Sequence, residues 1–133
     1  MLPDFKFHHI GIAVFDIDAT ARYYVEAGYK KSETIVDPIQ NIRICFLSKE
    51  GMPMLELLAP VDDKSPVVKT LEKVGVTPYH SCYLVRNIEE AIVLLKKKHF
   101  ILLGKPVEAC AINNKKVCFL FNREVGLIEL LEE

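Results

Sequence analysis

The feature that most constrains the fold of this chain is an internal repeat. The segment that begins HIGIAVFDIDATARYY at His9 aligns with HSCYLVRNIEEAIVLL at His80, at a constant offset of 71 residues. Later in each half, FLSKEGMPMLELL aligns with FLFNREVGLIELL at an offset of 73 residues, which places Glu56 on Glu129. A chain with this pattern consists of two copies of one supersecondary unit, and each copy is small for burying a core by itself.

Each half has the pattern of a strand, a helix and then three strands. In the first half we expect a strand at Phe7–Val14 and a helix at Asp16–Gly28, because apolar residues recur there at helical spacing between an N-cap residue and a glycine. The remaining strands of this half are expected at Lys31–Val36, Ile42–Ser48 and Met54–Leu58. The second half is expected to contain a strand at Ser81–Val85, a helix from Ile88 to about Lys98, and strands near Ile101–Leu103, Lys116–Phe121 and Leu127–Leu131.

A helical linker joins the two halves. Ser65 as N-cap, Pro66 at the first helical position and Gly75 after the last turn predict a short helix within about residues 65–75. Module 1 then covers about residues 4–60 and module 2 about residues 78–133. We therefore predict a single α+β domain over residues 1–133, built from two tandem βαβββ modules that form one curved sheet with pseudo-two-fold symmetry.

Composition excludes several classes of function. The formal net charge is −1 and the 17 basic residues are scattered, so nucleic acid is not an expected partner. No apolar run is long enough to cross a bilayer, and the start MLPDFKFHH lacks the pattern of a secretory signal, so we expect a cytoplasmic protein. The four cysteines, which include no C-x-x-C pair, are expected to be reduced: Cys45, Cys82, Cys110 and Cys118.

Four polar residues stand in apolar strands at repeated positions. Glu56 and Glu129 each lie between aliphatic neighbours, where an ionised carboxylate is costly unless it is paired or bound to a metal. His9 and His80 occupy equivalent places in the first strand of each half. Two imidazoles and two carboxylates are donors for one divalent metal ion, so the repeat predicts a metal site between the modules. The alternative is a structural cluster of hydrogen-bonded polar side chains.

The other two histidines lack support from the repeat. His8 adjoins His9, but neighbouring residues of a strand face opposite sides, and the second half has Tyr79 at the equivalent position. His99 lies near the end of the second predicted helix. Neither is expected to bind the metal.

The chain resembles the vicinal oxygen chelate superfamily of paired βαβββ proteins. The resemblance spans the whole chain and is carried by HHIGIAVFDIDATARYYVEAGY, LELLAP, YHSCYLVRNIEEAI and GLIELLEE. In metal-dependent members, the matching positions bind the ion. The resemblance thus implies the same four ligands, namely His9, Glu56, His80 and Glu129, with nickel or cobalt favoured and zinc, manganese or iron possible.

Two activities of that superfamily are the main alternatives. The donor set favours a glyoxalase I, which isomerises the hemithioacetal of methylglyoxal and glutathione to S-lactoylglutathione, with Glu129 and Glu56 as the candidate catalytic bases. The alternative is a methylmalonyl-CoA epimerase, because the linker between the two halves is similar to the linker of those enzymes. Epimerases typically read P-E-Q-G where this chain has Pro38-Ile39-Gln40-Asn41, so the loop carboxylate is missing. A metal-free antibiotic-binding module and a ring-cleaving dioxygenase are less favoured.

The superfamily resemblance also implies a homodimer, and we predict that all four ligands of each site come from one chain. A linker of about 20 residues can return the second half beside the first without exchange between chains. Mixing inactive His9→Ala and His80→Ala proteins should therefore restore no activity. Recovery of activity after subunit exchange would show that two chains share each site.

Overall fold

The computed structural model describes residues 2–133, and the chain divides into two compact units. The first-half unit is His9–Tyr79, and the second-half unit joins the chain up to His8 to His80–Glu133. Two long strands belong to both units. Strand β1 (Lys6–Ala13) enters the first-half unit at His9, and β6 (Thr77–Val85) leaves it after Tyr79.

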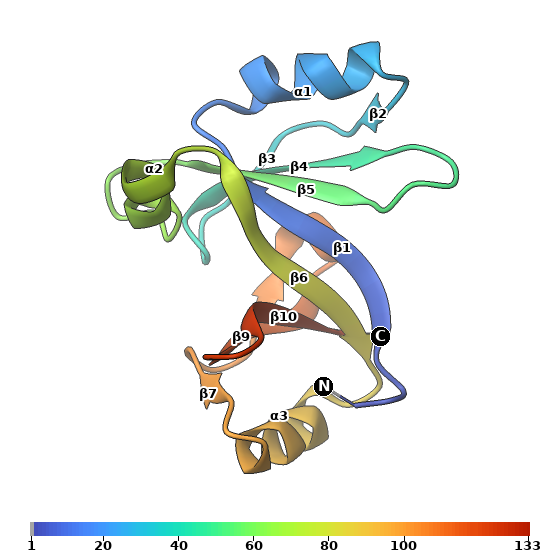
Figure 1. Ribbon diagram of the computed structural model, residues 1–133, viewed down its shortest axis with the longest axis vertical. Coiled ribbons are helices and arrows are strands. Elements are labelled where there is room, and N and C mark those ends of the chain that lie inside the picture. Colours follow the sequence, from blue (N-terminus) through green and yellow to red (C-terminus); the bar gives the residue numbers. More distant parts are fainter. Residues whose placement is uncertain (1) are drawn as a thin grey trace. The chain divides into compact units, whose positions relative to one another are not determined.

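The first-half unit places one helix on a mixed set of strands. Its elements after β1 are, in order, α1 (Ile17–Glu26), β2 (Lys30–Lys31), β3 (Ile35–Asp37), β4 (Ile42–Ser48), β5 (Leu55–Pro60) and α2 (Val68–Val74). Strand β5 lies between β1, which is parallel to it, and β4, which is antiparallel. Helix α1 lies over β2, β4 and β5 (Figure 1) and buries Ile17 and Ala21 against Leu47 and Leu57.

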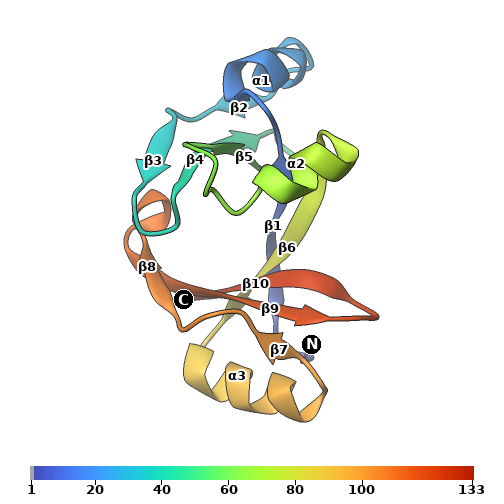
Figure 2. The ribbon, with the colours of Figure 1, turned by 90° about the vertical axis from the view of Figure 1, so that its left-hand side faces the viewer.

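The second-half unit repeats this arrangement. Its elements after β6 are α3 (Ile88–Lys97), β7 (Ile101–Leu102), β8 (Val107–Ala109), the 3₁₀ turn η1 (Cys110–Ile112), β9 (Lys115–Asn122) and β10 (Gly126–Glu132). Strand β10 is parallel to β6 and antiparallel to β9. Helix α3 lies beside β7 (Figure 2) and contacts β10, and its residues Ile88 and Leu95 join a core cluster with Leu120 and Leu130. Among residues 2–133, no helix combines the length and apolarity needed to span a membrane.

The predicted α+β class and the repeated order of elements are confirmed. The helix starts also agree, because each main helix begins after a residue whose side chain caps it. The Asp16 carboxylate accepts the backbone N–H of Ala19 at 2.9 Å, and the Asn87 side-chain oxygen accepts that of Glu90 at 2.9 Å.

Three predicted boundaries are wrong. The strand expected at Lys31–Val36 is two short strands, β2 and β3. The pairing stops at Ser32, because its hydroxyl accepts the backbone N–H of Phe46 in place of the backbone carbonyl that would accept it in a continuous strand. The linker helix begins at Val68, not after Ser65. The Ser65 hydroxyl instead accepts the backbone N–H groups of Val61 and Asp62, so it closes the preceding turn. Strand β6 begins at Thr77, four residues before the predicted start.

The cysteines provide a test of the core. Cys45, Cys82 and Cys118 are buried, whereas Cys110 is exposed. Burial raises the pKa of the Cys118 thiol to about 12 and also raises the pKa of Cys45. The reactive thiolate is therefore scarce at these buried positions near neutral pH.

We expect a maleimide at pH 7.5 to modify only Cys110 in the native protein, and to modify all four cysteines in urea. Mass spectrometry of the labelled protein and of a Cys110→Ser control measures this. Rapid labelling of Cys118 in the folded Cys110→Ser protein would contradict the described core.

Candidate metal centre

The first-half unit holds a buried histidine against a buried glutamate. His9 on β1 and Glu56 on β5 are 0% and 3% exposed, and His9 Nε2 lies 3.3 Å from Glu56 Oε1. The parallel register pairs Gly11 with Glu56. His9 lies two residues before Gly11 in β1, so its side chain is on the same face of the strands as that of Glu56. The ring of Phe46, from β4, meets the His9 ring edge-on at 5.6 Å between centroids.

The second-half unit builds the same pair from the equivalent residues. His80 on β6 and Glu129 on β10 are 5% and 3% exposed, with His80 Nε2 at 3.6 Å from Glu129 Oε1. The ring of Phe119 meets the His80 ring edge-on at 5.3 Å between centroids. The register of β10 on β6 pairs Glu129 with Cys82. The repeat in sequence is thus a repeat of side-chain environment.

The buried carboxylates require a charged or polar partner. Along β5, Leu55 and Leu57 belong to the core cluster on the helix side, and the alternation of the strand turns Glu56 to the other face. An ionised carboxylate buried there costs on the order of several kcal/mol unless an ion pair, hydrogen bonds or a metal compensates. The imidazole beside each glutamate provides a partner in each unit.

The four buried side chains fit a metal ion by their chemistry. Two imidazoles and two carboxylates form a donor set consistent with one divalent ion. His8 and His99 differ from this set in burial, because His8 is half-buried and His99 is exposed beyond the end of α3. His99 adopts a φ of 67°, which closes the end of the helix as Gly28 does after α1.

Sequence reasoning missed a third buried carboxylate, Asp37. It stands at the end of β3 and is 0% exposed. Its Oδ1 accepts the backbone N–H groups of Ile39 and Gln40, and its Oδ2 accepts the Gln40 side-chain amide at 2.8 Å. An Asp before Pro at the end of a strand is a signal for such a turn. The turn presents Ile39, which is 61% exposed, and offers no carboxylate besides the one it encloses.

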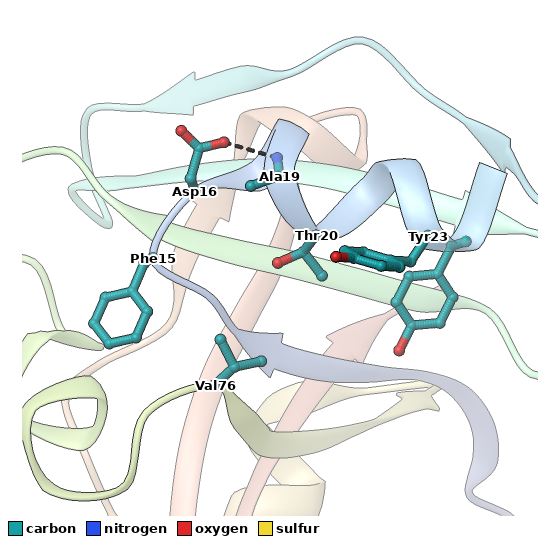
Figure 3. Close-up of a pocket in the computed structure, with 7 residues that line it drawn as sticks. Phe15, Asp16, Ala19, Thr20, Tyr23 and Val76 are labelled. Carbon is teal, nitrogen blue, oxygen red and sulfur yellow. Dashed lines mark hydrogen bonds between the residues drawn. The ribbon is translucent and has the colours of Figure 1, made fainter. Parts of the chain in front are cut away.

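A surface pocket of about 440 Å³ lies elsewhere in the first-half unit. Phe15, Thr20, Tyr23 and Val76 line it beside the start of α1 (Figure 3). The one carboxylate in it, that of Asp16, caps the helix through Ala19. Neither His9 nor Glu56 lines this pocket, so it is separate from the candidate metal ligands.

Residues 8–119 match the family described as the glyoxalase/bleomycin resistance protein/dioxygenase superfamily. The chain belongs to this superfamily. It is 33% identical to human mitochondrial methylmalonyl-CoA epimerase, over 94% of this chain and 72% of the relative. The crystal structure of methylmalonyl-CoA epimerase from Mycobacterium tuberculosis matches with a TM-score of 0.86 at 26% identity, over 99% of this chain and 92% of that one.

A Streptomyces coelicolor methylmalonyl-CoA epimerase variant in complex with 2-nitronate-propionyl-CoA is also similar. Its TM-score is 0.82 at 26% identity, over 96% of each chain. That relative binds a small acyl-CoA ligand.

The prediction of glyoxalase I is wrong, since these relatives and structural neighbours are methylmalonyl-CoA epimerases. The prediction failed because it gave decisive weight to the donor set and to the missing carboxylate at Ile39. A set of two histidines and two glutamates serves any reaction in which a metal holds substrate oxygens beside a carbon acid, so it does not select one reaction.

Substitutions separate a metal centre from a structural polar cluster. We expect His9→Ala, His80→Ala and Glu129→Gln each to lower the affinity for a divalent ion by roughly 10-fold or more, while the chain stays folded, because the apolar clusters do not depend on these side chains. Calorimetric titration with Co²⁺ and circular dichroism measure the two effects. The matched control is His8→Ala, which should bind metal as the unsubstituted protein does. Full metal stoichiometry in His80→Ala would contradict the proposed ligand.

Proposed function

We propose that this protein is a metal-dependent methylmalonyl-CoA epimerase. The observation that carries the proposal is its similarity to methylmalonyl-CoA epimerases over 94% of the chain by sequence and 99% by structure. The buried His–Glu pair in each unit supports it, because a chelating site needs donors of this kind.

In this proposal His9, Glu56, His80 and Glu129 of one chain hold a single divalent ion. Bound there, the ion would supply a Lewis acid that polarises oxygens of the thioester substrate and makes the adjacent carbon more acidic. Imidazole and carboxylate donors suit cobalt, nickel, zinc, manganese and iron, and the metal content of the purified protein identifies the ion. We also propose that the protein is a homodimer.

The two glutamates are proposed to move the proton at carbon 2 of the substrate. An epimerase removes a proton from one face of this carbon and returns a proton to the other face. One carboxylate takes the proton, and the electrons of the broken C–H bond pass into the thioester carbonyl. The other glutamate, protonated on the carboxyl oxygen that would not hold the ion, then donates its proton to the opposite face. Glu56 and Glu129 suit this pair of roles because they come from equivalent strands of the two units.

The test is epimerisation in D₂O. We expect the protein to interconvert the two epimers of methylmalonyl-CoA and to incorporate deuterium at carbon 2. Glu56→Gln and Glu129→Gln should each lower epimerisation by about 10²- to 10⁴-fold. Each variant should keep exchange in only one epimer, because one base remains. Nuclear magnetic resonance and chiral chromatography measure the two processes.

The exposed His99→Ala variant is the control and should keep full activity. No exchange or epimerisation by the metal-loaded protein would overturn the proposed function. If Glu56→Gln loses deuterium exchange equally from both epimers, the proposed epimerase activity still stands. The assignment of Glu56 as the second base would then be contradicted.

A further inference from the structure

One glycine has no backbone reason to be glycine. The chain has six glycines, and five of them adopt φ between 73° and 95°, where residues with a Cβ are strained. The sixth, Gly11, lies inside β1 and has no positive φ. A glycine inside a strand weakens it, because it adds flexibility and packs no side chain, and it often marks a place that another group approaches closely.

Gly11 lies directly beside a candidate metal ligand. The register of β1 on β5 pairs it with Glu56, and on the other side of Glu56 the register of β4 places Phe46. Adjacent strands are about 4.8 Å apart, and paired residues present their side chains on the same face. Glu56 therefore has an aromatic ring on one side and no side chain on the other. The next residue on this face of β1 is also small, because it is Ala13.

The second-half unit fills the equivalent positions. Its strand β6 has Cys82 beside Glu129 and Leu84 two residues later, where β1 has Gly11 and Ala13. Cys82 is fully buried and packs with Val117 and Leu131.

The His, Glu and Phe side chains beside the two positions are arranged alike. The angle between the His and Phe rings is 78° in both units, and the His–Glu distances differ by only a few tenths of an ångström. The missing side chain at position 11 is therefore a local difference between two matched environments.

We propose that Gly11 determines which alkyl branch the enzyme accepts on carbon 2 of its substrate, because that branch lies over Gly11 beside Glu56. The inference rests on the proposed function, which gives the substrate a short branch at the carbon that exchanges its proton. A methyl or ethyl group is close in size to the side chain that Cys82 supplies in the other unit. The glycine adds no side chain beside Glu56, whereas Cys82 occupies the matching place beside Glu129.

The experiment compares methylmalonyl-CoA with ethylmalonyl-CoA, whose branch is longer by one methylene group. The variants are Gly11→Ala and Gly11→Val, with Ile12→Val as a control on the helix-facing side of the same strand. The measured quantities are kcat/KM for epimerisation of each thioester and the dissociation constant of each by calorimetry, with and without added Co²⁺.

We expect Gly11→Val to lower the ratio of ethylmalonyl-CoA to methylmalonyl-CoA activity by roughly 10-fold or more, the usual effect of one methylene group in a restricted pocket. Gly11→Ala should lower it less, the calorimetric affinities should follow the same order, and Ile12→Val should keep the unsubstituted ratio. If Gly11→Val does not fold, as judged by circular dichroism, Gly11→Ala decides the question.

An unchanged ratio in folded, metal-binding Gly11→Val overturns this inference and leaves the proposed function standing. A higher ratio in Cys82→Gly with no change in the Gly11 variants also overturns it, because the branch would then lie in the second-half unit. An unsubstituted protein that neither binds nor epimerises either thioester overturns both proposals.

Discussion

A buried carboxylate beside a buried imidazole is the interaction around which each half of this protein is arranged. Glu56 and Glu129 each lie between aliphatic neighbours in their strands, and neither could stay there in ionised form without compensation. In each unit a histidine of the neighbouring strand provides part of this compensation, with 3.3 Å between His9 Nε2 and Glu56 Oε1 and 3.6 Å between His80 Nε2 and Glu129 Oε1. Because strands alternate faces, the leucines beside each glutamate still reach the core under the helix.

The two units differ at several positions that correspond in the repeat. The turn after β3 ends with one asparagine in the left-handed conformation, Asn41 at φ 56°, whereas the turn after β8 ends with two, Asn113 at φ 54° and Asn114 at φ 58°. At the start of these turns the first-half unit has the buried Asp37, and the second-half unit has the buried Ala109. These positions, together with Gly11 and Cys82, are places where the side chains depart from the symmetry of the repeat.

The reaction was the part of the function that residue types alone could not assign. Glyoxalases and epimerases both need a metal that holds oxygens beside a carbon acid, so the same donors serve both reactions. The absence of a loop carboxylate at Ile39 suggested a glyoxalase, yet the similar proteins are epimerases. A base can come from different places in one fold, because only its reach to the reacting carbon matters.

The sequence by itself determined the repeat, the α+β class, the two helix caps and the burial of the two His–Glu pairs. These features follow from local patterns, since capping residues and apolar spacing act within a few residues of the chain. Only the tertiary structure decided which residues lie side by side across strands. The neighbours of Glu56 on β1 and β4, and the split of the predicted Lys31–Val36 strand by Ser32, depend on strand register. Register is set by contacts between distant segments, and a shift of one residue would turn every side chain to the opposite face.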